Sequence, residues 1–349
     1  MAITIRDANI KKELNILQDL LNRNRDQTFD RDRFVWLYLD NPEGSAKAWF
    51  VIDEATNQAV AFTAVLPRMF MVEGRKITVW NCSDFSVDKK FRTLGIAIKL
   101  RRIAKDAIED GYTPALYAHP NDNRMDIVHQ KVGHKRLGGM QRFVKLLDTR
   151  KFIENKIHSK IISAILSNTI NIVFTFIDLT NKTEGNYHFK TSTNTLFGKE
   201  FDILFYNACK AYRILGDRRS TYLNWRFSKN PLYETECLEI YDDSSLAGYI
   251  LYFEDNGKVH LLDILFIPPK KNGHALLRMW IKLMRKRKVD SISLVLLESN
   301  PFISLFKKHG FRKRPEESSV FVYAEPESWL EPIWTNGGNW FMTVGDRDV

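Results

Sequence analysis

The sequence predicts a mixed α/β protein made of two similar halves, and three observations support this prediction. The chain has 349 residues, which is more than one ordinary hydrophobic core needs and enough for two. Several landmarks recur in the same order at a nearly constant spacing. Strand-like and helix-like segments follow one another within each half. We therefore expect an α/β (α+β) fold of two tandem domains, each a mixed, mostly antiparallel sheet flanked by helices.

The composition limits the class of protein. Hydrophobic residues make up 44% and charged residues 27%, which excludes collagen-like, coiled-coil and disordered chains. The net charge of +10 favours phosphate-bearing partners, such as a nucleotide cofactor, nucleic acid or a membrane face. The three widely spaced cysteines form neither a metal-binding pattern nor a disulfide framework. We expect a cytoplasmic protein without a bound metal.

One apolar stretch, residues 161–179, approaches the length of a membrane span. Serine, threonine and asparagine residues interrupt it, whereas a span needs about 20 predominantly apolar residues. We expect a buried connecting segment and no transmembrane segment. Peripheral contact with a membrane is the alternative, and the strongly basic segment 270–288 is compatible with it.

The repeat is visible in three pairs of landmarks. They are Trp36 and Trp225 at an offset of 189, Asp84 and Asp263 at 179, and Gly133 and Gly310 at 177. Such agreement indicates a duplicated domain. We predict a first domain at 1–146, a helical or irregular connector at 147–217 and a second domain at 218–349.

The elements of the first copy follow from local patterns. Segments 48–54, 59–67 and 77–87 have strand composition with stretches of period two. A helix is predicted from 95 to 109, because Ile96, Leu100, Ile103 and Ala107 fall on one face. A short strand at 114–120 and a helix at 121–132 follow, and Gly133 suits the end of that helix.

The second copy repeats this order. Strands are predicted at 238–243, 246–254 and 258–267, a helix at 272–287, a strand at 291–299 and a helix at 301–309.

An anion site is predicted between the strand ending at Val87 and the helix beginning near Gly95. The first N–H groups of a helix lack intrahelical partners, and the helix dipole adds positive potential there. Gly95 and Ala97 are small enough for a phosphate to approach the backbone, and Arg92 adds charge. A capped helix with a solvated basic start is the alternative, but the strand–turn–helix context favours a phosphate.

The segment Val87 to Leu100, VDKKFRTLGIAIKL, resembles the acetyl-CoA-binding signature of the GNAT N-acetyltransferases. The segment Asn121 to His134 resembles the helix that this superfamily places beside the pantetheine arm. The resemblance covers about residues 45–145 and, more weakly, 235–325. A finer similarity is to tandem GNAT proteins associated with cell-surface polysaccharide assembly.

This resemblance implies a cofactor site for acetyl-CoA. The pyrophosphate would lie on the backbone N–H groups of Leu94, Gly95, Ile96 and Ala97, with Arg92 alongside. The strand end would bind the pantetheine arm through Phe85, Ser86 and Val87, and Asn121 or Asn123 would contact it from the next helix.

The resemblance also implies two catalytic candidates. His129 stands where the superfamily often has a Tyr that protonates the departing thiolate, and the alternative is a polar residue that fills space. Asp84 would draw the proton from the acceptor amine, and the alternative is an ion pair with a nearby arginine.

The second copy lacks the phosphate signature. Its corresponding turn contains Pro268 and Pro269, and Phe306 occupies the acid position. We therefore expect one cofactor site, with the second copy shaping the acceptor site. Its candidate substrate-binding residues are Tyr222, Arg226, His260 and Asp263.

The resemblance implies an N-acyltransferase that moves an acetyl group from acetyl-CoA to a primary amine by direct attack. The expected acceptor is an amino sugar or a sugar nucleotide that can carry a phosphate. The alternative is a Fem-type aminoacyltransferase that uses aminoacyl-tRNA and acts on a cell-wall precursor, and nucleic acid is expected as a partner only in that case. A non-catalytic binding module would have lost the phosphate turn in both copies.

Overall fold

The computed structural model describes residues 2–92, 94–120, 122–150, 153, 166, 169 and 186–347. Asn121 and nearly all of the apolar stretch 161–179 lie outside these residues. Within the described residues, no helix is long and apolar enough to cross a lipid bilayer.

The first half begins with a strand and two helices that the local patterns did not predict. Its elements are β1 (Ile3–Asp7), α1 (Ile10–Asn22), α2 (Arg31–Tyr38), β2 (Lys47–Asp53), β3 (Gln58–Val72), β4 (Arg75–Val87), η1 (Lys89–Phe91), α3 (Leu94–Glu109), β5 (Ala115–Ala118), α4 (Asn123–Lys131) and β6 (Lys135–Leu146).

The second half has the same order of longer helices and strands, with one additional short strand, Ile214–Gly216. They are β7 (Tyr187–Thr193), α7 (Lys199–Ala208), β8 (Ile214–Gly216), α8 (Ser220–Leu223), the π-helical turn η2 (Asn224–Ser228), β9 (Glu236–Asp242), β10 (Ser245–Asp255), β11 (Lys258–Phe266), α9 (Lys270–Lys286), β12 (Ser291–Leu297), α10 (Ile303–Lys308) and β13 (Arg312–Ala324). The chain continues through α11 (Glu331–Trp334), η3 (Gly337–Asn339), β14 (Trp340–Phe341) and η4 (Val344–Asp346).

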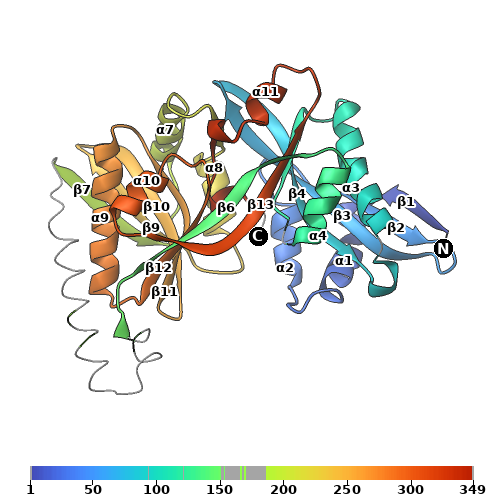
Figure 1. Ribbon diagram of the computed structural model, residues 1–349, viewed down its shortest axis with the longest axis horizontal. Helices are drawn as coiled ribbons and strands as arrows, with labels where there is room; N and C mark the ends of the chain where they lie inside the picture. The colour runs from blue at the N-terminus through green and yellow to red at the C-terminus, as the bar shows by residue number, and fades with distance from the viewer. Residues whose placement is uncertain are drawn as a thin grey trace.

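The strands of the described residues form one sheet, which spans both halves (Figure 1). Most neighbouring strands are antiparallel, and the pairs β4–β5, β11–β12 and β8–β14 are parallel. Their order along the sheet is β1-β2-β3-β4-β5-β13-β6-β12-β11-β10-β9-β7. The expectation of a duplicated, mixed and mostly antiparallel α/β fold is confirmed.

The two halves exchange their last strands. β13 from the second half lies between β5 and β6 of the first, and β6 lies between β13 and β12. Each half therefore completes its sheet with a strand from the other. Local patterns did not predict β6 and β13, and β7, α7 and β8 lie within the range predicted as a connector.

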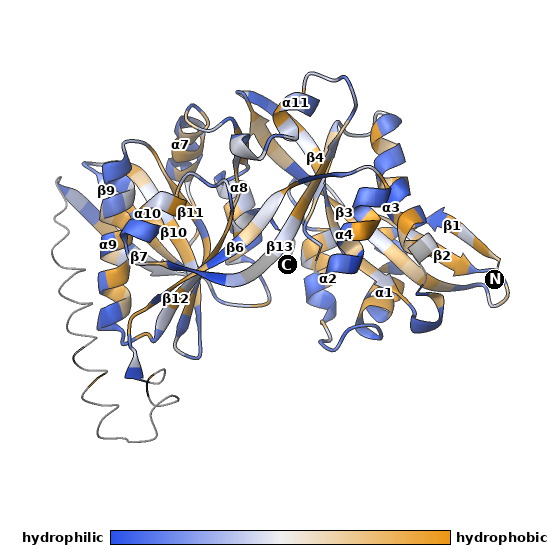
Figure 2. Cartoon of the chain, in the orientation of Figure 1, coloured by the Kyte–Doolittle hydropathy of each residue, from blue (hydrophilic) through white to orange (hydrophobic). Residues whose placement is uncertain are grey.

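Helices cover both faces of the sheet. In the first half, α3 packs through Ile96 and Leu100 on one face, whereas α1 and α2 pack on the opposite face (Figure 1). In the second half, α9 carries both hydrophobic and hydrophilic residues along its length (Figure 2). Its hydrophobic residues, including Trp280 and Met284, are buried.

A reciprocal tryptophan pair joins the two halves at equivalent positions of the repeat. The Trp36 indole N–H donates to the carbonyl of Trp225 at 2.7 Å, and the Trp225 indole N–H donates to the carbonyl of Trp36 at 2.8 Å. Their ring centroids are 5.4 Å apart, and both side chains are buried. One of the three landmark pairs that revealed the repeat in the sequence, Trp36 and Trp225, thus forms a direct contact between the two halves.

Removing one indole donor tests this junction. Trp36→Phe keeps an aromatic ring but leaves the buried carbonyl of Trp225 without its donor, so we expect a loss of about 1–3 kcal/mol in unfolding free energy. Urea denaturation measures it. Trp329→Phe, at a side chain with 44% exposure, is the control and should stay within about 0.5 kcal/mol of wild type. Equal losses in the two variants would contradict a specific role for the pair.

Candidate functional site

Strands β4 and β5 separate at the centre of the first half. They pair only from Trp80 to Cys82 of β4 and from Leu116 to Ala118 of β5. Beyond Cys82, the register of β4 against β3 shifts by a bulge, and β4 continues to Val87 without β5 beside it. The predicted pantetheine-binding residues Phe85, Ser86 and Val87 therefore lie on a strand edge that β5 does not occupy.

The predicted phosphate turn connects this strand end to α3. Arg92 donates through Nε to the carbonyl of Val87 at 3.0 Å and through its terminal nitrogen to Asn24 at 3.1 Å. Its guanidinium thus orders the turn. The first turn of α3 contains no acidic residue, and Gly95 is exposed. The dipole of this sixteen-residue helix therefore favours an anion at its start.

Asp84 lies in the bulge and is almost completely buried. Both of its carboxylate oxygens accept from Arg33 of α2, at 2.8 and 3.0 Å, and Tyr38 donates to one of them at 2.9 Å. This is the ion-pair alternative that the sequence left open. The proposed role of Asp84 as a base stays a prediction.

His129 of α4 is buried beside a second histidine. Its Nδ1 is 2.8 Å from the Nδ1 of His134, and its ring stacks on Phe321 of β13 with centroids 5.3 Å apart. Burial and the nearby charge of Arg101 hold the pKa of His129 well below its usual range. Burial likewise lowers the pKa of His134 to about 3. Both rings are therefore neutral at neutral pH, and one donates its Nδ1 proton to the other.

Arg101 is a buried cation that the sequence analysis did not single out. It donates to the Thr63 hydroxyl at 2.9 Å and to the carbonyl of Ser83 in the bulge at 3.3 Å, and its guanidinium stacks on Phe85. No carboxylate among the described residues forms an ion pair with it. The helical periodicity of the sequence places Arg101 on the buried face of α3. The periodicity gives no sign that its charge lacks a carboxylate partner.

Three buried polar side chains at the separation of β4 and β5 have unpartnered atoms. They are the carbonyl oxygen of the Asn81 side chain, the Ser83 hydroxyl and both ring nitrogens of His119. His119 directly follows β5 and the strand residue Ala118, which pairs with Cys82. Burial lowers the pKa of His119 well below its usual range, so its ring is neutral. Because buried polar atoms normally have partners, this cluster indicates where a ligand would bind.

Asn123, the remaining predicted cofactor residue of the described chain, begins α4 and is exposed. Asp122, immediately before it, caps the helix by accepting from the backbone N–H of Met125 at 2.9 Å. The structure thus brings the strand end, the turn and the start of α4 together around the separation of β4 and β5. His129 lies deeper, beneath β13.

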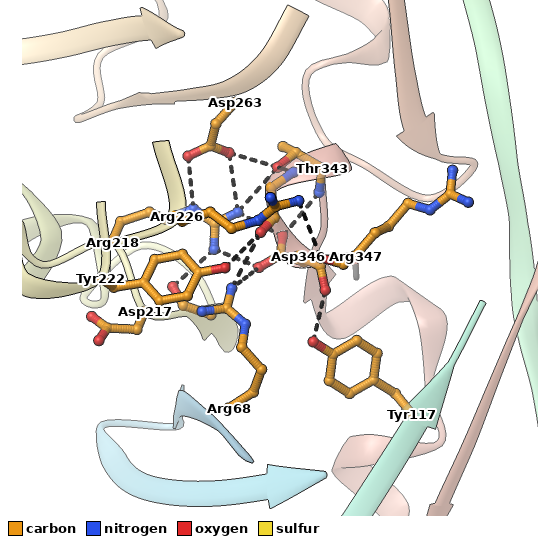
Figure 3. A network of polar contacts seen from close by, with 12 residues as sticks. Arg68, Tyr117, Asp217, Arg218, Tyr222, Arg226, Asp263, Thr343, Asp346 and Arg347 are labelled. Atoms are coloured by element: carbon orange, nitrogen blue, oxygen red, sulfur yellow. Dashed lines mark hydrogen bonds and ion pairs between the residues drawn. The ribbon is translucent and has the colours of Figure 1, made fainter. Parts of the chain in front are cut away.

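The equivalent aspartate of the second half, Asp263, belongs to a different network. It accepts from Arg218 at 3.2 Å, from Tyr249 at 2.7 Å and from Thr343 at 2.6 Å (Figure 3). Arg218 also binds Asp346 at 2.6 Å. Residues near the carboxyl end of the described chain therefore fill the space around Asp263.

Arg68 of the first half joins the same network. It pairs with Asp346 at 3.1 Å and lies over the ring of Tyr222, whose hydroxyl donates to the carbonyl of Gly345 at 2.9 Å (Figure 3). Charge pairing with Arg218 and Arg68 lowers the pKa of Asp346 despite its burial. Asp346 thus connects Arg68 of the first half with Arg218 of the second. Two predicted substrate-binding residues, Tyr222 and Asp263, are part of this network.

The second separation, between β11 and β12, is filled. Phe266 stacks on Phe302 with centroids 4.1 Å apart, and Phe341 packs against Phe302 at 5.0 Å. Gly273, near the start of α9, is so close to Phe266 that any side chain there would clash. Aromatic side chains thus occupy the region that corresponds to the predicted cofactor site of the first half. His260 lies apart from the Asp263 network, with its ring stacked on Phe253.

The buried histidines predict a pH dependence of stability. His119, His129 and His134 resist protonation when folded but bind protons near pH 6.5 when unfolded, so unfolding takes up protons. Stability is therefore fully present above pH 6.5 and falls as the pH drops toward 3, by about 1.4 kcal/mol per pH unit for each histidine.

Urea denaturation between pH 7 and pH 5 measures this slope. His134→Gln is expected to reduce it by about one histidine's share, or about 1.4 kcal/mol per pH unit below pH 6. His188→Gln, which changes an exposed side chain of β7, is the matched control and should keep the wild-type slope. An unchanged slope in His134→Gln would show that the proton uptake has another source.

Comparison with known proteins gives similarity in structure only. No protein-family model and no curated protein matches the sequence. A GCN5-related N-acetyltransferase from Anabaena variabilis is 12% identical with a TM-score of 0.65, covering 93% of this chain and 73% of its own. A tandem GNAT protein of clavulanic acid biosynthesis is 12% identical with a TM-score of 0.55, covering 94% and 100%.

An N-myristoyltransferase from Saccharomyces cerevisiae is 13% identical with a TM-score of 0.57, covering 92% of this chain and 80% of its own. All three similarities extend over both halves of the chain. Together with the duplicated order of elements, they show that this chain has the tandem GNAT fold.

Proposed function

We propose that this protein is an N-acyltransferase that moves an acetyl group from acetyl-CoA to a primary amine. The observation that carries the proposal is the difference between its two halves. The first half has an exposed Gly95 at its helix start and unpartnered polar atoms where β4 and β5 separate, whereas aromatic side chains fill the corresponding separation of the second half. A single cofactor site in the first half follows, with an amino sugar or sugar nucleotide as acceptor.

In this proposal, the pyrophosphate of the cofactor binds the backbone N–H groups at the start of α3, from Leu94 to Ala97. The pantetheine arm lies along the free edge of β4, at Phe85 to Val87, and carries the thioester into the separation. A strand edge without a neighbour offers backbone donors and acceptors that match an amide-containing chain. The unpartnered polar atoms of Asn81 and Ser83 favour a small acyl group over a long hydrocarbon chain.

The amine nitrogen attacks the thioester carbonyl, the carbon–sulfur bond breaks, and the amine loses a proton while the thiolate gains one. His119 can accept the proton transiently, because both of its ring nitrogens are unpartnered at the separation, although burial makes its ring a weak base. Asp84 is the second candidate, although its oxygens are bound by Arg33 and Tyr38. Arg101 stabilises the departing thiolate by its charge. Because burial keeps His129 neutral, its ring is a poor proton donor, and the thiolate takes up the proton that the amine has released.

Calorimetry with acetyl-CoA tests the cofactor site. Saturable binding is expected for wild type, and Gly95→Glu should abolish it because the new carboxylate blocks and repels the pyrophosphate. Gly95 is exposed on a helix, so this variant should remain folded. Arg102→Gln, which makes the same change in charge at an exposed position of α3, is the control and should bind normally.

Myristoyl-CoA provides a comparison of chain length and is expected to bind less tightly than acetyl-CoA at equal ionic strength. Tighter binding of myristoyl-CoA would replace acetyl with a long acyl group as the proposed donor. A wild-type protein that binds neither thioester would overturn the proposed function.

A further inference from the structure

Arg226 differs from the other predicted substrate-binding residues. Tyr222 and Asp263 are engaged in the Asp346 network, and His260 stacks on Phe253. Arg226 is 3% exposed, yet one terminal nitrogen has no partner, and the other makes only a 3.4 Å bond to the carbonyl of Arg347. Its remaining contacts are with the faces of Trp36 and Phe227.

The buried charges between the halves do not balance. Three buried arginines have carboxylate partners: Arg33 pairs with Asp84, Arg68 with Asp346, and Arg218 with Asp263 and Asp346. A further buried aspartate, Asp217, pairs with Arg219. Among residues 2–92, 94–120, 122–150, 153, 166, 169 and 186–347, Arg226 has no ion-pair partner. Of the five buried arginines of the described residues (Arg33, Arg68, Arg101, Arg218 and Arg226), Arg101 and Arg226 thus have no carboxylate partner, and Arg226 is the one that contacts both halves, through Trp36 and Phe227.

An unmatched buried cation is costly, because burial removes the hydration of the charge and no anion replaces it. Contacts with aromatic faces recover only part of that cost. A guanidinium with a free edge is well suited to a carboxylate or phosphate oxygen, which would restore both the hydrogen bonds and the charge balance. The missing partner is one negative charge.

The position of Arg226 relates this missing charge to the acceptor. Its guanidinium lies 5.7 Å from the centroid of the Trp36 ring. Trp36 is on α2, three residues after Arg33, and Arg33 pairs with Asp84 in the bulge of β4. The backbone carbonyl of Arg347 accepts from Arg226, and the charge of the Arg347 side chain helps to lower the pKa of His119. Arg226 therefore lies on the face of the sheet that α2 covers, whereas the start of α3 packs on the opposite face.

We propose that the acceptor carries an anionic group that binds Arg226, while its amine reaches the separation of β4 and β5. This inference rests on the proposed function and names the substrate class for the same site. The anion is a carboxylate or a phosphate, and the cofactor's own phosphates bind elsewhere, at α3.

Three matched acceptors test the inference: glucosamine, glucosaminuronic acid and glucosamine 6-phosphate, each with acetyl-CoA. Wild type is expected to prefer an anionic sugar over glucosamine by about 10- to 100-fold in kcat/KM. Arg226→Met should lose this preference, and Arg226→Lys should keep part of it. Preference for the carboxylate or for the phosphate identifies the anion. A preference that persists in Arg226→Met, or none in wild type, would overturn the inference.

Thermal unfolding separates binding from a structural role. Arg226→Met should keep or raise the melting temperature, because it removes an unmatched buried charge. Arg218→Met is the matched control and should lower it strongly, because it leaves Asp263 and Asp346 without their guanidinium. Equal losses in the two variants would mean that Arg226 is balanced within the protein, which overturns the inference.

Failure of the proposed function gives a different result. In that case wild type binds no acyl-CoA, whereas glucosaminuronic acid or glucosamine 6-phosphate alone would still raise the melting temperature of wild type and not of Arg226→Met. If neither sugar produces a shift that depends on Arg226, the inference fails whatever the donor.

Discussion

The exchange of β6 and β13 is the constraint on which the rest of the structure depends. Each half lacks a strand of its own sheet and receives it from the other half, so neither sheet is complete alone. The reciprocal bonds of Trp36 and Trp225 fix the same relationship at a second place. Because both contacts join equivalent positions of the repeat, the halves meet in a nearly symmetric way. The separation of β4 from β5 in one half therefore has a counterpart between β11 and β12 in the other.

Symmetry in the backbone has allowed the two separations to take different roles. In the second half, Phe266, Phe302 and Phe341 fill the space, and Asp263 binds Arg218 and the chain end. In the first half, the equivalent Asp84 binds Arg33, and unpartnered polar atoms remain beside it. A filled apolar separation stabilises the fold, whereas a polar one with unpartnered atoms lowers stability and is suited to a ligand. Under the proposed function, the first copy carries the reaction and the second copy stabilises the fold.

Local patterns in the sequence were sufficient for the repeat, for helices α3 and α4 and for the turn at Gly95, because each depends on neighbouring residues. They could not predict that β6 and β13 exchange, because strand pairing across about 177 residues leaves no local periodicity. The partner of Asp84 arrives from α2, 51 residues earlier in the chain. The free nitrogens of His119 and the unmatched charge of Arg226 are properties of the three-dimensional surroundings. Residue type alone identified the candidate residues. Their contacts in the structure then distinguished residues that stabilise the fold from residues that can still bind a ligand.

The position of β13 and Asp346 also determines the order in which the chain can fold during synthesis. When the ribosome has completed the first half, β5 has no neighbour on one side, and β13, the strand that will cover it, begins about 170 residues later in the chain. Arg68 waits longer, since its carboxylate partner is 278 residues further along. An exposed strand edge in a nascent chain is prone to pair with other chains. Production of this protein therefore depends on protecting that edge until β13 has been translated, and truncated chains that end before β13 would expose it permanently.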